Sequence, residues 1–260
     1  MKTIMRYFAV LVSILILISP LSSLRGADFE ELDKIPEGAH KGQMLLGAFV
    51  CIGVPRGDVI KAEEDFVKDS TYSFDNETTK LVEVSHLSMG GGLRFEYMPL
   101  NHLGLQLNAR ITFIMQRSSF GKDYQNWRGA LYKDYSLYLG PSLHATVRKQ
   151  WDFTLTPLLG YAFYSFHATP VYARMNTDYS GSMSRKGSGI TYGTEINCTL
   201  YFSGGLFVSL GVEWMRNPVK FSEPFDLTNP QTNKKYFEGK TAGSIDSYNF
   251  VLSSGYAFSN

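Results

Sequence analysis

The 260-residue chain contains no apolar run long enough to cross a bilayer as an α-helix, which needs roughly 20 residues. Its formal net charge is only +1, so the composition shows no bulk attraction to nucleic acid or to acidic lipid. It has two cysteines, Cys51 and Cys198, without the spacing of metal ligands. We predict that both are free thiols. These absences argue against transmembrane helices, nucleic-acid binding and a cysteine metal site.

The sequence also lacks a recognisable catalytic motif. No GxSxG is present, and the GGG at 90–92 is not followed by the lysine or helix of a phosphate loop. Ser142 and His144 share one face of a predicted strand, roughly 6–7 Å apart. We interpret them as polar lining, with a catalytic pair as the minor alternative. His86 and His167 lie near predicted loop boundaries without zinc spacing, so we expect exposed or interfacial side chains. No cofactor, metal or enzyme is indicated.

The N-terminus predicts a secretory signal peptide. Lys2 and Arg6 form a basic segment, the apolar core runs from Phe8 to Ile18, and Pro20 ends it. An uncleaved N-terminal anchor is the alternative. The predicted organisation is a signal peptide at 1–27 with cleavage at about 22–27, a short periplasmic tail at 28–42 and a barrel domain at 43–260.

Aromatic residues are abundant and apolar residues alternate with polar or small ones. The 16 Tyr and 18 Phe favour β structure. From Leu93 to Phe113, every second residue on either side of MPLNH is apolar or small, as in two strands joined by a tight turn. Similar alternation predicts eight strands, at 43–53, 84–98, 103–116, 132–147, 151–166, 189–202, 206–215 and 245–258. Each could supply the roughly 9–11 residues that a tilted strand needs to cross a membrane.

The connections between these strands alternate in length. PLNH, RKQ and SGG are short, whereas 54–83, 117–131, 168–188 and 217–244 are long and polar. An even strand number with short turns at one end and long loops at the other is typical of outer-membrane barrels. We predict an all-β, antiparallel, up-and-down transmembrane β-barrel with eight strands, short periplasmic turns and four long extracellular loops. A soluble lipocalin-like barrel, with its apolar face inward, is an alternative.

The two faces of the predicted strands differ in composition. From the third strand to the eighth, one face carries an uncharged apolar series, such as the alternate residues from Leu105 to Phe113 on the third and from Tyr248 to Phe258 on the eighth. The other face carries small and polar residues. Five charged residues on the polar face are the predicted lumen network: Arg94, Glu96, Arg110, Glu195 and Glu213. Eight strands leave an interior just wide enough for side chains to fill, and buried charges must be paired. The facing of the first strand is undecided, because both its faces are apolar.

Aromatic residues gather near the two predicted membrane borders. Such bands match the aromatic girdles of outer-membrane barrels, whose rings lie at the level of the lipid headgroups. The predicted girdle consists of Tyr97, Trp151, Phe153, Tyr192, Phe202, Trp214, Tyr248 and Phe258.

This architecture resembles the small outer-membrane β-barrel proteins of Gram-negative bacteria, similar to OmpX and the OmpA transmembrane domain within the porin-like barrels. The resemblance covers about residues 43–260 and includes the ending SSGYAFSN. Gly255 and Phe258 match the family's assembly signal and Tyr256 is in phase with Phe258, whereas Asn260 departs from the terminal aromatic. The resemblance implies location in the bacterial outer membrane. It implies as partners the barrel-assembly machinery, outer-membrane lipids and lipopolysaccharide.

The resemblance leaves several activities open, because such barrels include structural proteins, adhesins, narrow channels and lipid-modifying enzymes. We interpret the chain as a non-enzymatic barrel with a filled polar lumen. It would act in envelope structure or in surface interaction through its long loops, where an extracellular ligand could bind. The alternatives are a narrow porin-like channel for small solutes and an outer-membrane lipid-modifying hydrolase.

Overall fold

The computed structural model describes residues 38–68, 71–74, 77–120, 124–147, 150–168, 183–224, 227–228 and 233–258. The predicted signal peptide and most of the predicted tail lie outside these residues.

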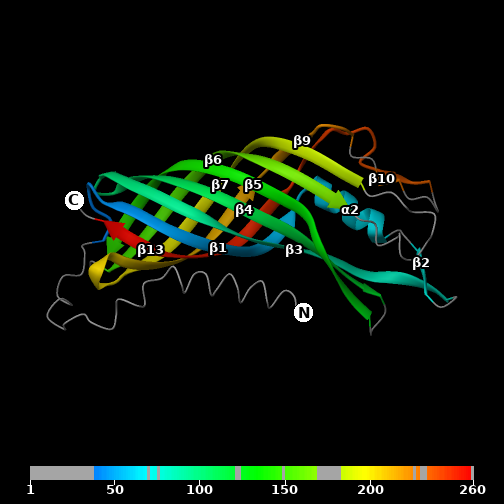
Figure 1. Ribbon diagram of the computed structural model, residues 1–260, viewed down its shortest axis with the longest axis horizontal. Coiled ribbons are helices and arrows are strands. Elements are labelled where there is room, and N and C mark those ends of the chain that lie inside the picture. The colour runs from blue at the N-terminus through cyan, green and yellow to red at the C-terminus, as the bar shows by residue number, and fades with distance from the viewer. Residues whose placement is uncertain are drawn as a thin grey trace.

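The chain folds into a closed antiparallel barrel. Its eight strands are β1 (Met44–Arg56), β3 (Glu77–Leu100), β4 (Leu103–Phe120), β5 (Tyr124–Val147), β6 (Trp151–Ala168), β7 (Met183–Tyr201), β8 (Leu206–Arg216) and β13 (Asp246–Phe258). Neighbours in this order pair along the sheet, and β1 with β13 completes the circle. This confirms the predicted fold class and strand number. Figure 1 shows the C-terminal end of the chain at one end of the barrel and α2 at the other.

Shorter elements decorate the long-loop end. They are helix α2 (Asp58–Lys68) and strands β2 (Thr71–Phe74), β9 (Pro218–Phe221), β10 (Leu227–Thr228), β11 (Lys235–Tyr236) and β12 (Ala242–Ser244). β2 pairs with β3, β9 pairs with both β7 and β12, and β10 pairs with β11. No helix in the described ranges is long and apolar enough to cross a membrane.

Several strands extend further toward the long-loop end than predicted. Residues 117–131, predicted as a loop, mostly continue the β4–β5 ribbon, which reaches the pair Phe120 and Tyr124. The segment 54–83, also predicted as a loop, contains α2 and β2. The alternation of apolar and polar residues identifies a strand only where one face meets an apolar environment. A ribbon that meets water on both faces loses that pattern.

The outer surface of the barrel is apolar. Large apolar side chains on every strand point outward, such as Leu93 on β3 (60% exposed), Leu210 on β8 (62%) and Phe250 on β13 (65%). On β1, Leu46 and Ile52 also point outward while the alternate residues are buried, which settles the facing of this strand. The soluble lipocalin-like alternative is wrong, because it requires the apolar face inside.

The short-turn end is closed by tight turns and a small apolar cluster. Asn101 and His102 connect β3 to β4. Gly204 and Gly205 connect β7 to β8 with φ angles of 74° and 86°, which glycine adopts without strain. The cluster inside this end consists of Ala39, Leu45, Met98, Tyr201, Phe207 and Ala257.

One part of the barrel wall lacks regular strand pairing. Residues 132–139 and 143–147 of β5 pair with β6, whereas residues 140–142 do not. Pro141 and Pro157 are the central residues of this gap, both on the outer surface. Proline has no N–H to donate to a ladder. Both prolines pair in register with their other neighbouring strands, so the interruption is confined to the β5–β6 seam.

Helix α2 covers the long-loop end, where it contacts β1, β3 and strands β10–β12 (Figure 1). Val59 and Ile60 on its first turn are buried, as are Phe237 and Ile245 of the last long connection. Asp58 accepts hydrogen bonds from the backbone N–H and the hydroxyl of Ser244, the latter at 2.8 Å. We call α2 together with β10–β12 the cap. Its apolar contacts and its hydrogen bonds hold it against the barrel.

Candidate functional site

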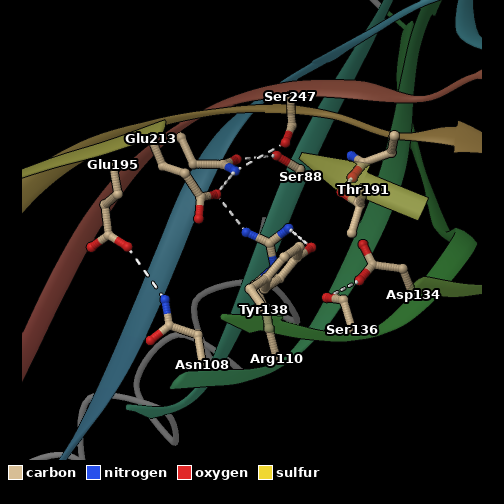
Figure 2. Close-up of polar contacts among 12 residues, drawn as sticks. Ser88, Asn108, Arg110, Asp134, Ser136, Tyr138, Thr191, Glu195, Glu213 and Ser247 are labelled. Atoms are coloured by element: carbon tan, nitrogen blue, oxygen red, sulfur yellow. Dashed lines mark hydrogen bonds and ion pairs between the residues drawn. The ribbon is translucent and has the colours of Figure 1, made fainter. Parts of the chain in front are cut away.

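The first polar network of the lumen joins β4 to β8. Arg110 donates from Nη1 to Glu213 Oε1 at 2.5 Å and from Nη2 to the Tyr138 hydroxyl at 2.5 Å. Its guanidinium carbon lies 4.8 Å from the centroid of the Tyr138 ring. Asn249 donates to Glu213 at 2.8 Å and accepts a bond from Ser88 at 3.0 Å. All five side chains are buried, and Figure 2 shows Arg110 between Glu213 and Tyr138.

A second network is built on Arg94, which lies two residues nearer the short-turn end than Arg110. Arg94 Nη2 forms an ion pair with Glu195 Oε1. Three amides add to it: Asn197 donates to Glu195 at 2.7 Å, Gln106 at 3.3 Å and Asn108 at 3.4 Å. A carboxylate removed from water needs this many donors, because an isolated buried charge is strongly destabilising.

A third network lies closer still to the short turns. His144 Nδ1 lies 2.6 Å from Asp152 Oδ2, and its Nε2 lies 2.8 Å from Glu96 Oε1. Ser142 donates to the same Glu96 oxygen. Ser142 therefore bonds a carboxylate, and both nitrogens of His144 are occupied by carboxylates. Ser142 and His144 therefore do not bond each other in the way that a nucleophile bonds its base in a serine–histidine pair. Gly104 makes room for this network, since a Cβ there would lie 2.5 Å from Glu96 Oε1.

The structure brings the five residues of the predicted lumen network into the barrel interior, all of them buried. Two arginine–glutamate pairs form, whereas Glu96 pairs with His144 instead of with an arginine. Sequence reasoning missed Asp152, which continues the polar face of its strand together with Thr154.

Glu195 and Glu213 lie directly opposite each other on β7 and β8. Each of these two like charges depends on its own arginine from the β3–β4 hairpin. The pairing thus links the two halves of the chain across the lumen.

The lumen is filled by side chains. Tyr138, Leu158 and Met215 form a buried cluster in its middle, and Phe49, Cys51 and Val251 form another. A cavity of about 10 Å³ lies between Arg94 and His144, which is room for about one water molecule.

The cap is anchored to the barrel by a histidine. His86 lies 3.1 Å from Glu63 Oε2 and 3.2 Å from Glu64 Oε1, both on α2. It is buried, so the expectation of an exposed or interfacial His86 is wrong, because α2 covers the position. His167 has no described side chain. Burial alone would lower the pKa of His86, but the two glutamates raise it to about 9. The hydrogen bond from His86 lowers the pKa of Glu64.

The structure places the predicted girdle residues on the outer surface. They are 38–58% exposed, with Tyr97, Trp151, Phe153, Phe202 and Phe258 toward the short turns and Tyr192, Trp214 and Tyr248 toward the long loops. The Tyr192 and Trp214 rings meet edge to face at 6.5 Å.

The residues of the predicted assembly signal lie at the end of β13. Tyr256 and Phe258 have ring centroids 6.2 Å apart. Gly255 faces β1 so closely that a Cβ would lie 2.1 Å from the Leu46 carbonyl oxygen.

Neither cysteine is in a disulfide: Cys51 is buried in the lumen and Cys198 is half-buried. Within the described ranges, no group of three or more His, Cys, Asp or Glu is arranged to hold a metal ion.

Comparisons with known proteins identify the fold. No family model matches the sequence, and no curated protein matches it. The outer membrane protein OprG from Pseudomonas aeruginosa matches with a TM-score of 0.50 and 15% identity, over 86% of this chain and 100% of OprG. Neisserial surface protein A matches with a TM-score of 0.40 and 10% identity, over 82% and 98%. The outer membrane protease OmpT from Escherichia coli matches with a TM-score of 0.36 and 12% identity, over 84% and 95%. At this identity the OprG match shows the fold alone, which is that of the small outer-membrane barrels.

Proposed function

We propose that this chain is a non-conducting, non-enzymatic barrel of the Gram-negative outer membrane, which acts through its cap in envelope structure or surface interaction. The observation that carries the proposal is the closure of the lumen at successive levels. An apolar cluster closes the short-turn end, three polar networks cross the interior, and α2 covers the long-loop end.

The outer surface supports the membrane location. Its apolar side chains form a continuous band on all eight strands, bordered by aromatic residues at both ends. In water such a surface would aggregate, whereas in a bilayer it replaces lipid–lipid contacts at little cost. The shortest barrel strand, β8, has 11 residues, which suffices to cross a membrane at roughly 9–11 residues per strand.

The cap supports a role outside the membrane. It has its own buried apolar residues, so it presents a shaped surface in place of loose loops. The hydrogen bonds of Ser142 and His144, described above, argue against a serine–histidine hydrolase.

Planar-bilayer conductance tests the closed lumen. Purified wild type and a variant lacking residues 58–68 should both show no stable open channel, because removal of α2 leaves the deeper networks intact. A steady ohmic conductance in wild type would contradict the proposal and favour a narrow pore.

Gel mobility with and without boiling tests the membrane barrel itself. We expect the unboiled protein, extracted in detergent from outer-membrane fractions, to migrate differently from the boiled protein. Recovery of the native protein in soluble form without detergent would exclude the membrane location.

A further inference from the structure

Three lysines gather on the outer wall at its long-loop border. Lys133 on β5 and Lys186 on β7 both pair in register with Ser165 of the strand between them. Lys220 on β9 pairs with Ser188, two residues along β7 from Lys186. All three lysines are exposed. Adjacent strands are about 4.8 Å apart, so the three lysine Cα atoms span roughly 10–15 Å of the surface.

An aromatic and apolar surface begins directly beside these lysines. The next row toward the short turns holds Tyr135 and Phe163, 51% and 60% exposed, in register with Ser188 and therefore level with Lys220. Tyr161 follows on β6 and donates its hydroxyl to Ser188 at 2.8 Å. The wall therefore changes from three ammonium groups to an apolar band within a few residues.

The one carboxylate that borders the lysines among the described residues, Glu223, pairs with Arg185 at 3.2 Å. None of the three lysines forms an ion pair with another residue in the described ranges. Arg216, the last residue of β8, pairs in register with Tyr192 of β7 and adds a fourth exposed cation next to β9. On β1, by contrast, Arg56 pairs in register with Asp246 of β13. The positive charge is thus concentrated on the β5–β9 side.

We propose that this surface, Lys133, Lys186 and Lys220 with Ser165 and Ser188, binds the phosphorylated headgroup of a glycolipid in the leaflet at the long-loop end. The proposal rests on the membrane location proposed above. Lysine side chains extend along apolar surface and place their ammonium groups at the headgroup level. Serine hydroxyls between them can donate to phosphate oxygens. The exposed rings below offer an apolar face to the acyl chains, so the site selects a ligand that carries both phosphate and acyl chains.

Native mass spectrometry of the intact protein in detergent, titrated with diphosphoryl lipid A, tests this site. We expect the triple variant K133Q, K186Q, K220Q to lose about tenfold or more in lipid affinity, since each lysine near a charged lipid surface contributes measurably. The matched control K61Q, K68Q, K240Q removes the same total charge from exposed positions of the cap and should bind like wild type.

Two further probes identify the ligand chemistry. Dephosphorylated lipid A should bind wild type as weakly as diphosphoryl lipid A binds the triple variant. Millimolar inorganic phosphate should not displace the lipid, because it lacks the acyl chains. Equal loss in the control variant, or unchanged affinity in the triple variant, would overturn the proposal.

The mobility shift on boiling separates this inference from the proposed function. A folded, heat-modifiable triple variant that still binds lipid A refutes only the lysine site. A wild-type protein that shows no membrane barrel at all refutes the proposed location as well.

Discussion

The ion pair between Arg110 and Glu213 provides the sharpest test of the lumen networks. Substitution of Arg110 by Met keeps much of the side-chain volume but removes the charge. Glu213 then stays buried beside Glu195, its opposite neighbour on β7, with the Asn249 amide as a remaining donor. Breaking a buried pair on one side costs about 3–5 kcal/mol. We expect this loss in the free energy of unfolding for R110M.

The loss should be asymmetric. The change E213Q also removes a partner of Arg110, but it relieves the repulsion between the two opposed carboxylates. We therefore expect E213Q to cost less than R110M. The double variant R110M, E213Q should cost clearly less than the sum of the two single variants.

Urea unfolding in phospholipid vesicles, followed by tryptophan fluorescence and by gel mobility, measures these differences. The exposed Arg216 on β8 supplies the control, since R216Q changes the same net charge on the outer surface and should stay within about 0.5 kcal/mol of wild type. Additive effects of R110M and E213Q, within about 0.5 kcal/mol, would refute a coupled pair.

Three further predictions concern the cap, the seam and the closing strand. The cap should open in alkali: with the pKa of His86 raised to about 9, its stabilisation is full below about pH 6.5 and lost as the pH rises through 9. Hydrogen exchange of α2, corrected for the intrinsic rate, should show this, and a pH-independent α2 would contradict it. The double variant P141V, P157V should restore ladder bonds worth about 0.5–1.5 kcal/mol each, seen as a higher urea midpoint; an unchanged or lower midpoint would argue against the seam. Finally, G255V should force β13 away from β1, reducing the heat-modifiable fraction, whereas S254V on the outer surface should assemble normally.

The barrel strands could be predicted because membrane burial imposes a period of two. For β8, the predicted range 206–215 differs by one residue from the observed Leu206–Arg216. The alternation does not reveal which face of a strand meets lipid where the lumen-facing residues are also apolar. On β1, Leu45, Phe49 and Cys51 pack inside the barrel, and nothing in their chemistry separates them from lipid-facing residues.

The sequence of helix α2 contains a helical pattern of apolar residues, although its acidic composition is typical of a loop. Val59 and Ile60 recur seven residues later as Phe66 and Val67, which is a helical period, and Asp58 precedes them. The acidic character of the segment favoured a loop.

The ion-pair partners could not be predicted from the sequence for a different reason. Arg94 and Glu195 are 101 residues apart, and many pairings of the same charges satisfy the alternation. Only the register of all eight strands selects one, and the same holds for the contact of His86 with α2.

The distribution of charge between the two hairpins bears on the order of folding. The β3–β4 hairpin carries Arg94 and Arg110, and the β7–β8 hairpin carries Glu195 and Glu213. Either hairpin alone in a bilayer would separate these two charges from their ion-pair partners, and a charge at mid-membrane costs roughly 2–4 kcal/mol. The early half of the chain therefore gains little by inserting before the late half arrives. Insertion and closure should be a single concerted event, with the arginines crossing the membrane only together with their glutamates.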